Sequence, residues 1–141
     1  MRLAIVGNSG SGKSTLARWA AQTFSAAHLD LDTVAWEPEA IAVPREPAVA
    51  KADVAAFCTS RKHWVVEGCY ASLVAVSLSH GARLLLLHPG EAQCLANCRA
   101  RPWEPHKYAS PAEQQEQLDF LLDWVRAYES RQDELSLSAH R

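Results

Sequence analysis

The sequence predicts one α/β domain over residues 1–141, in which a parallel sheet of four to five strands lies between two layers of helices. Two observations support this three-layer α/β/α fold class. Short apolar runs, which are typical of buried strands, alternate with segments whose apolar residues recur at helical spacing. A glycine-rich loop joins the first apolar run to the first helical segment, and parallel α/β domains bind ligands at such strand ends.

Four short apolar runs are expected to be the strands. Leu3–Val6 is continuously apolar, as expected of a strand that is buried on both faces of a parallel sheet. The other strands are expected at 27–31, 64–68 and 83–87. No fifth apolar run is visible after the last helical segment, so the fourth strand is expected to be an exposed edge of the sheet.

Helical segments separate these runs and follow the last one. They are expected from residue 14 to about residue 24, and at 48–61, 70–79, 91–99 and 118–128. Proline interrupts residues 37–47 and 101–111, so neither segment can be one regular element. We expect the acceptor region within residues 32–61 and a short lid at residues 101–111.

The composition excludes several classes of protein. The chain has 14 Lys and Arg residues against 16 Asp and Glu residues, a formal net charge of −2, and 48% of its residues are hydrophobic. Neither a disordered chain nor a basic nucleic-acid-binding domain has this balance, so direct nucleic-acid binding is not expected. No apolar run approaches the roughly 20 residues of a membrane-spanning helix. We therefore expect a cytoplasmic protein.

The four cysteines contain no Cys-x-x-Cys pair, so a disulfide framework is not expected. Cys94 and Cys98 are four residues apart in a helical segment, where small thiols usually serve as buried hydrophobes. The alternative is a zinc site that these thiols would form with His88 or His106.

The glycine-rich loop carries the most specific motif of the chain. Residues 7–14 match G-x-x-x-x-G-K-[ST] at every defined position, between an apolar strand and an amphipathic helix. Glycines let successive backbone N–H groups point at one phosphate, and the start of the helix adds partial positive charge. The residues expected to bind the nucleotide are Gly7, Asn8, Ser9, Gly10, Ser11, Gly12, Lys13, Ser14 and Thr15.

Two side chains of this loop have expected chemical roles. The Lys13 ammonium group is a catalytic candidate because, as a mobile point charge, it can reach the β- and γ-phosphate oxygens of ATP. The Ser14 hydroxyl can ligate Mg²⁺. ATP and Mg²⁺ are therefore the expected ligands, and a glycine-rich turn without a ligand is the alternative.

Carboxylates at neighbouring strand ends are candidates for holding the metal and for accepting a proton. Glu67 ends the third expected strand, where it would orient Mg²⁺ or its waters, and the alternative is a surface acid. Asp30 and Asp32 end the second strand with alternate spacing, so their side chains are expected to point the same way. Asp30 would then contact Mg²⁺, and Asp32 would accept a proton from an acceptor hydroxyl or orient it. The alternative is a cap or turn around Thr33.

Basic residues at the start of the second proline-rich segment are candidates for stabilising the transferred phosphoryl group. Arg99, Arg101 and Lys107 lie where a lid would lie, and Arg99 or Arg101 would clamp the phosphates or stack on the adenine. The alternative is ordinary basic charge at the carboxyl end of a helix. Trp36 closely follows the acid pair and would wall the acceptor pocket by stacking.

Together these residues resemble the P-loop nucleotide-kinase-like proteins, the group of adenylate and shikimate kinases. The glycine-rich loop, residues 29–32 with Trp36, residues 64–68 with Tyr70, and residues 99–102 look most like the adenylate-kinase-related proteins that are labelled DNA topology modulation proteins. The resemblance implies a P-loop NTPase domain of the nucleoside monophosphate kinase type, with a short lid, that binds ATP and Mg²⁺. It matches Asp30-x-Asp32 to the acid pair of shikimate kinase and Glu67-Gly68 to the acid-glycine pair of adenylate kinase.

The chain departs from this family pattern after Gly68. The adenylate kinase pattern continues to an arginine that grips the acceptor phosphate, whereas Cys69, Tyr70 and Ala71 follow here. This departure counts against a nucleoside monophosphate as the acceptor, and Arg45 or Arg61 would be the alternative grip.

We therefore expect an ATP-dependent kinase that transfers the γ-phosphoryl group to a small-molecule acceptor, which is a nucleotide or a hydroxylated metabolite. The alternative is a nucleotide-binding regulator or slow ATPase that acts through a protein or DNA partner. A scaffold that keeps the fold without turnover is the third interpretation.

Overall fold

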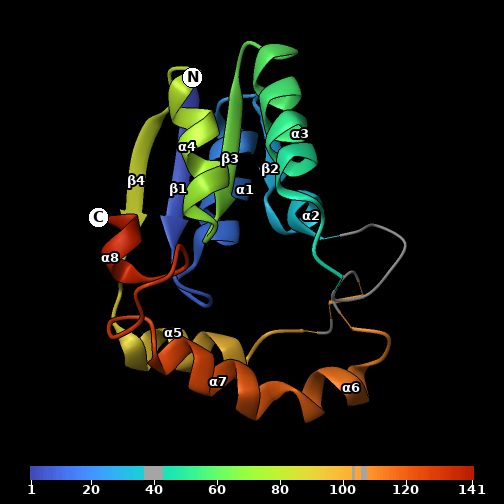
Figure 1. The fold of residues 1–141 in the computed structure, drawn as a ribbon, viewed down its shortest axis with the longest axis vertical. Coiled ribbons are helices and arrows are strands. Elements are labelled where there is room, and N and C mark those ends of the chain that lie inside the picture. The colour runs from blue at the N-terminus through green and yellow to red at the C-terminus, as the bar shows by residue number, and fades with distance from the viewer. Residues whose placement is uncertain (37–42, 103, 106–107) are drawn as a thin grey trace.

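The computed structural model describes residues 1–36, 43–102, 104–105 and 108–141. Four strands form one parallel sheet in the order β2-β3-β1-β4 (Figure 1). The strands are β1 (Arg2–Gly7), β2 (Ala27–Asp30), β3 (Trp64–Gly68) and β4 (Arg83–Leu87). The predicted parallel sheet is confirmed, and the glycine-rich loop leaves it at its carboxyl edge.

Helices cover both faces of the sheet, and a further group lies beyond its carboxyl edge (Figure 1). α1 packs on one face, while α3 and α4 pack on the other. The longest helix in the described ranges, α3, has 13 residues, and none there is long and apolar enough to cross a membrane. The helices are α1 (Lys13–Thr23), α2 (Asp32–Ala35), α3 (Pro47–Thr59), α4 (Ala71–Ser79), α5 (Glu91–Arg99), α6 (Pro111–Glu116), α7 (Leu118–Arg126) and α8 (Leu137–His140).

The two faces of the central strands are built from alternating residues. Ile5 and Val65 pack with Ala17 of α1 on one face. Their neighbours along β1 and β3 point the other way and join a cluster with Val54 of α3 and Val74 of α4. Because both faces are covered, residues 3–6 of β1 and 64–66 of β3 are continuously apolar instead of alternating between apolar and polar residues.

α5 and α7 pack against each other beyond the carboxyl edge, and we call them the α5–α7 pair. Cys94 and Cys98 of α5 contact a cluster that includes Leu122 and Val125 of α7. Both thiols are buried and free, so the expectation that they are small buried hydrophobes is confirmed. Among the described residues, which do not include His106, no group of three or more His, Cys, Asp and Glu side chains could hold a metal.

The second strand is shorter than expected. It ends at Asp30, and Leu31 has right-handed helical backbone angles (φ −63°, ψ −21°) as it leads into α2. The expectation that Asp30 and Asp32 share one face of a strand is therefore wrong, because Asp32 is already helical. α2 and α8 were not expected from the sequence, because four residues make only about one turn and produce no periodic apolar pattern.

The first proline-rich segment ends where α3 begins. Pro47 lies in the first turn of α3, where its missing N–H costs no hydrogen bond, and the Glu46 side chain accepts the N–H of Val49. Residues 37–42 of the segment predicted to be irregular lie outside the described residues. Trp36 and Pro44 form an isolated antiparallel bridge.

β4 forms one edge of the sheet, as expected, and the described residues contain no fifth strand. Its middle is open to solvent, with Leu84 47% exposed. Edge strands of this kind carry backbone N–H and C=O groups that no neighbouring strand pairs.

His140 joins the last helix to the carboxyl edge of the sheet. The residue is 4% exposed, its Nε2 donates to the carbonyl oxygen of Cys69 (2.7 Å), and its Nδ1 accepts the hydroxyl of Tyr128 (2.8 Å). A neutral imidazole that carries its proton on Nε2 makes both hydrogen bonds. Burial lowers the pKa of His140 below its ordinary value of 6.5.

The burial of His140 predicts that acid destabilises the fold. The unfolded chain protonates this residue near pH 6.5 and the folded chain only at lower pH, so the stability is complete above 6.5 and decreases as the pH falls below it. One such group changes the free energy of unfolding by at most about 1.4 kcal/mol per pH unit. Urea unfolding at about pH 7.5 and about pH 5.5 measures this loss. His140→Gln, which does not titrate, should lose less stability between these values, and an equal loss in both proteins would contradict the prediction.

Candidate nucleotide-binding site

The glycine-rich loop connects β1 to α1. α1 begins at Lys13, and Gly12 caps it with a left-handed backbone (φ 93°). The first N–H groups of a helix have no acceptor within the helix, so those of Lys13, Ser14 and Thr15 are available to a ligand. Together with the helix dipole, these groups favour the binding of a phosphate.

The α5–α7 pair holds the outer side of this loop. Asn97 Nδ2 donates to the carbonyl oxygen of Gly10 (2.6 Å), and Asn8 Nδ2 donates to the carbonyl oxygen of Val125 (3.1 Å). Asn8 Oδ1 in turn accepts the N–H of Ser9 (2.8 Å). The conformation of the loop is therefore fixed by contacts with two helices that lie outside the sheet.

Gly10 lies too close to α5 to carry a side chain. A Cβ atom at this position would be 2.3 Å from the carbonyl oxygen of Cys94 and 2.8 Å from Sγ of Cys98, and the backbone φ is +80°. Only glycine combines this close approach with this backbone conformation. The glycine pattern of the loop therefore serves the packing of α5 as well as the approach of a phosphate.

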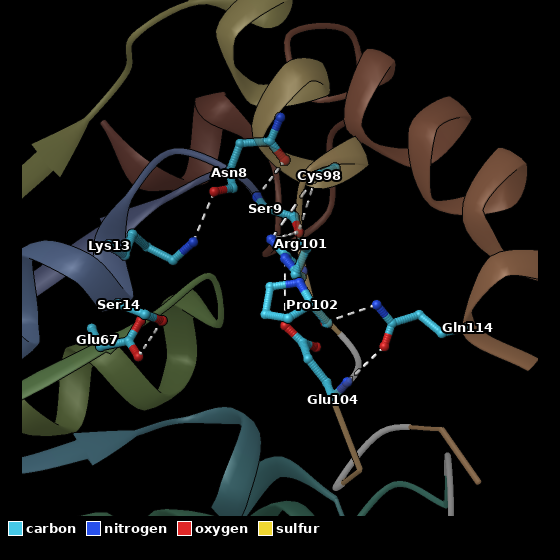
Figure 2. Close-up of polar contacts among 10 residues, drawn as sticks. All are labelled: Asn8, Ser9, Lys13, Ser14, Glu67, Cys98, Arg101, Pro102, Glu104 and Gln114. Atoms are coloured by element: carbon cyan, nitrogen blue, oxygen red, sulfur yellow. Dashed lines mark hydrogen bonds and ion pairs between the residues drawn. The ribbon is translucent and has the colours of Figure 1, made fainter. Parts of the chain in front are cut away.

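Two polar side chains inside the loop suit an anion. Lys13 is 8% exposed, and its Nζ donates to the carbonyl oxygen of Asn8 (2.7 Å) (Figure 2). Ser11 Oγ is buried and has no hydrogen-bond partner within the described part of the chain. A buried hydroxyl without a partner costs about 1–3 kcal/mol, and a phosphate oxygen would remove that cost. The ammonium, the orphaned hydroxyl and the first N–H groups of α1 fit the phosphates of ATP.

Ser14 and Glu67 bring two oxygen atoms together beneath the loop. Ser14 Oγ donates to Glu67 Oε1 at 2.9 Å, and Glu67, on β3, is only 1% exposed (Figure 2). His28 Nε2 of β2 lies 3.4 Å from the same carboxylate oxygen. Mg²⁺ prefers hard oxygen ligands and often binds through one or two protein groups, substrate phosphates and waters. The Ser14–Glu67 pair fits such a site.

Asp30 lies level with Glu67 in the sheet, but its carboxylate is hydrogen-bonded to the backbone. Asp30 Oδ1 accepts the N–H of Asp32 (2.9 Å), and the Asp30 carbonyl oxygen accepts the hydroxyl of Thr33 (2.6 Å). These bonds form the turn that was the alternative interpretation of the acid pair. A role for Asp30 as an Mg²⁺ ligand stays a prediction.

Asp32 is bound by a side chain from the loop between β3 and α4. The Tyr70 hydroxyl donates to Asp32 Oδ1 (2.6 Å), and Trp36 Nε1 donates to the Tyr70 oxygen (3.0 Å). Gly68 lets Leu31, the residue before Asp32, pack closely against the end of β3, because a Cβ atom at Gly68 would be 2.7 Å from the Cβ of Leu31. The Tyr70 hydroxyl therefore connects Asp32, the predicted proton acceptor, with Trp36, the predicted wall of the acceptor pocket.

The two arginines predicted to act on the phosphates differ in their location. Arg101 Nη2 donates to Ser9 Oγ (3.2 Å) and lies 3.9 Å from Cys98 Sγ, next to the loop (Figure 2). Arg99 is exposed at the end of α5. Lys107 lies outside the described residues. The structure thus places Arg101 at the loop and leaves Arg99 in solvent.

The described part of the predicted lid is attached to α6 by Gln114. Gln114 Nε2 donates to the carbonyl oxygen of Pro102 (3.0 Å), and its Oε1 accepts the N–H of Glu104 (2.7 Å) (Figure 2). The Glu104 carboxylate also lies 3.4 Å from Nε of Arg101. These contacts link the glycine-rich loop, Arg101 and α6.

Arg45 and Arg61, the two alternative residues for binding an acceptor phosphate, contact other side chains. Arg45 forms an ion pair with Asp53 of α3 through Nη1. Arg61 lies over the ring of Phe57, 4.5 Å from its centroid, between the end of α3 and the amino end of β3 (Figure 1). Arg61 is therefore at the opposite edge of the sheet from the loop.

The sequence did not indicate His28 or Asn97 as residues of the site, and it singled out Tyr70 only through the family resemblance, without a role. His28 lies two positions before Asp30, so strand alternation places it on the same face, and this pattern was a signal that could have found it. Asn97 gave no comparable signal, and nothing in the sequence indicated that Tyr70 contacts Asp32, because these contacts depend on how α5 and α2 pack on neighbouring elements.

No protein-family model and no curated protein matches the chain. Among solved structures, it is similar to a gluconokinase from Sinorhizobium meliloti 1021, with 22% sequence identity, a TM-score of 0.49, and coverage of 83% of this chain and 72% of that chain. It is also similar to a shikimate kinase from Acinetobacter baumannii in complex with shikimate, with 20% identity, a TM-score of 0.49, and coverage of 94% and 85%.

The Ser14–Glu67 pair predicts a metal-specific effect of changing Glu67. Glu67→Gln removes a carboxylate from the Mg²⁺ site, so the affinity for ATP with Mg²⁺ should fall about tenfold or more, while the affinity for ATP in EDTA changes less than about twofold. Calorimetric titration with and without Mg²⁺ measures both affinities, and circular dichroism checks the fold. Equal weakening under both conditions would assign Glu67 a purely structural role.

The different locations of Arg101 and Arg99 predict different effects of removing them. Arg101→Ala takes a positive charge from the loop and should lower the affinity for Mg·ATP about tenfold. Arg99→Ala is the matched control, because it removes the same charge from an exposed position and should change the affinity less than about twofold. Similar losses in the two variants would show that the charge acts without contact with the loop.

Proposed function

We propose that this chain is an ATP-dependent phosphotransferase that moves the γ-phosphoryl group of ATP to a hydroxyl group of a small-molecule acceptor. The observation that carries the proposal is the gathering of three groups at one edge of the sheet: the glycine-rich loop, the Ser14–Glu67 pair and Asp32. A protein that only held a nucleotide would not need the third group, which is a carboxylate outside the metal site.

The loop residues bind and orient the triphosphate. The N–H groups at the start of α1 and the Ser11 hydroxyl donate to phosphate oxygens. Lys13 leaves the carbonyl oxygen of Asn8 and follows the β- and γ-phosphates, because a flexible ammonium group can track charge as it shifts. Arg101, next to Ser9, adds positive charge at the rim of the loop.

Ser14 and Glu67 are the residues that would hold Mg²⁺, Ser14 through its hydroxyl and Glu67 through its carboxylate or through bound waters. When bound, the metal neutralises negative charge on the β- and γ-phosphates. Asp30, the third predicted metal residue, would need to release the N–H of Asp32 before it could join them.

The residues around Asp32 favour a hydroxyl as the acceptor nucleophile. A carboxylate can accept or orient a hydroxyl proton, whereas it repels an acceptor phosphate. Arg45, which would otherwise grip such a phosphate, is neutralised by Asp53. The proposed enzyme is therefore a small-molecule kinase of the adenylate and shikimate kinase type. Its closer likeness to the DNA topology modulation proteins is part of the same proposal.

The proposal predicts acceptor-dependent release of ADP. Purified protein is incubated with Mg·ATP alone and with AMP, CMP, glycerol, ribose, gluconate or shikimate. One of the hydroxyl acceptors should raise the rate at least about tenfold above the background without acceptor. Lys13→Ala should lower that rate about 100-fold or more while the circular dichroism spectrum stays unchanged.

Three results would contradict this proposal in different ways. Unchanged activity in Lys13→Ala would show that the glycine-rich loop takes no part in the reaction. Stimulation by AMP or CMP alone would show that the accepting group is the phosphate of a nucleotide and not the hydroxyl of a small metabolite. A slow, Lys13-dependent rate that no compound in the panel changes would favour a nucleotide-binding regulator or slow ATPase.

A further inference from the structure

Tyr70 forms a hydrogen-bonded connection that the steps above do not use. It directly precedes α4, and its hydroxyl lies 2.6 Å from Asp32 Oδ1 and 3.0 Å from Trp36 Nε1. Three residues from α2, its carboxyl cap and the β3–α4 loop therefore meet at one phenol oxygen. Asp32 is the residue expected to receive the acceptor proton, so this connection leads directly to the reacting groups.

The direction of the two hydrogen bonds follows from the chemistry of the three side chains. An indole N–H can only donate, and an ionised carboxylate can only accept. The Tyr70 hydroxyl must therefore accept from Trp36 and donate to Asp32. Burial, and then the negative charge of Asp32, raise the pKa of Tyr70 well above its ordinary value of 10, so the phenol keeps the proton that it donates.

The backbone of Asp32 is fixed as firmly as its side chain. Asp30 Oδ1 accepts the N–H of Asp32 (2.9 Å), and the preceding residue, Leu31, donates its N–H to the carbonyl oxygen of Glu67 (2.9 Å). Asp32 is thus connected through Leu31 to Glu67, the carboxylate of the proposed metal site. The distance between the proton acceptor and the metal site is held by β3 on one side and by Tyr70 on the other.

We propose that Tyr70 is a positioning residue that holds the Asp32 carboxylate directed at the acceptor hydroxyl, with Trp36 fixing the Tyr70 hydroxyl. The inference rests on the proposed function and deepens it, because it assigns residues to the acceptor side of the site. The short bond from the Tyr70 hydroxyl limits rotation of the Asp32 carboxylate, and the bond from Trp36 in turn fixes the hydroxyl.

The transfer step balances without a further reactant. The acceptor hydroxyl oxygen forms a bond to the γ-phosphorus, and the bond between that phosphorus and the oxygen that bridges to the β-phosphate breaks. ADP leaves with the electron pair of the broken bond. The hydroxyl proton passes to the Asp32 carboxylate and from there to solvent, while Tyr70 keeps its own proton throughout.

A double-mutant cycle tests whether Tyr70 acts through Asp32. With the hydroxyl acceptor identified from the panel, Tyr70→Phe should lower kcat about tenfold and leave the KM for ATP within about twofold, because the phenol does not touch the nucleotide. Asp32→Asn should lower kcat about 100-fold or more. In the Asp32→Asn background, Tyr70→Phe should change kcat by less than about twofold, because the shared interaction is already lost.

Tyr128→Phe is the matched control. Tyr128 is also a tyrosine with a raised pKa and a hydroxyl that contacts another side chain, but its partner is His140. Its removal should leave kcat within about twofold of the parent value. Trp36→Phe removes the bond to the Tyr70 oxygen but keeps an aromatic ring, and it should lower kcat less than Tyr70→Phe does, so the inference can also be tested without changing Tyr70.

A second measurement does not depend on activity. The chain has five tryptophans, and the indole N–H signal in a ¹H–¹⁵N spectrum that disappears in Trp36→Phe belongs to Trp36. Both Tyr70→Phe and Asp32→Asn should shift that signal, and Tyr128→Phe should not. A Trp36 signal that neither of the first two variants moves would overturn the connection itself.

The outcomes separate failure of the inference from failure of the proposed function. If a hydroxyl acceptor stimulates the enzyme but Tyr70→Phe keeps full kcat, or if its effect simply adds to that of Asp32→Asn, the positioning role is wrong and the kinase stands. If no hydroxyl acceptor stimulates the enzyme, the proposed function fails and the positioning role fails with it.

Discussion

The parallel register of β2, β3 and β1 is the constraint on which the candidate site depends. Glu67 of β3 is level with Asp30 of β2 on one side and with Ile5 of β1 on the other. Because all three strands end at the same edge, groups that are far apart in the sequence leave the sheet side by side. Ser14 can therefore contact Glu67 although 53 positions separate them. The apolar layers on both faces of the sheet keep these strands in register.

The loop between β1 and α1 combines a fixed backbone with polar groups that a ligand can satisfy. The α5–α7 pair fixes its outer side, and Gly10 leaves no space between the loop and α5. A site that is fixed before binding avoids the cost of ordering it when the ligand arrives. On the inner side, Ser11 Oγ is buried and has no partner among the described residues, and Lys13 Nζ donates to the carbonyl oxygen of Asn8. A phosphate would therefore stabilise the fold as well as bind to it.

The sequence predicted the sheet, the five longest helices and the position of the loop, because these features depend on apolar spacing and on a specific glycine pattern. It could not predict that β2 ends at Asp30, since the length of a strand depends on tertiary contacts such as the one between Leu31 and Gly68. It also could not separate Arg101 from Arg99, because both are basic residues near the end of one helix and only packing decides which reaches the loop. The Tyr70 connection to Asp32 joins the β3–α4 loop to α2, and no local pattern encodes it.

The central claim is that the γ-phosphoryl group reaches an acceptor oxygen other than that of water. The most direct test is ³¹P NMR of a reaction that contains the protein, Mg·ATP and the hydroxyl compounds of the panel. We predict that a new phosphomonoester signal grows in step with the signals of ADP. If the ADP signals grow together with inorganic phosphate alone, the γ-phosphoryl group has gone to water, and the claim that this chain is a small-molecule kinase is wrong.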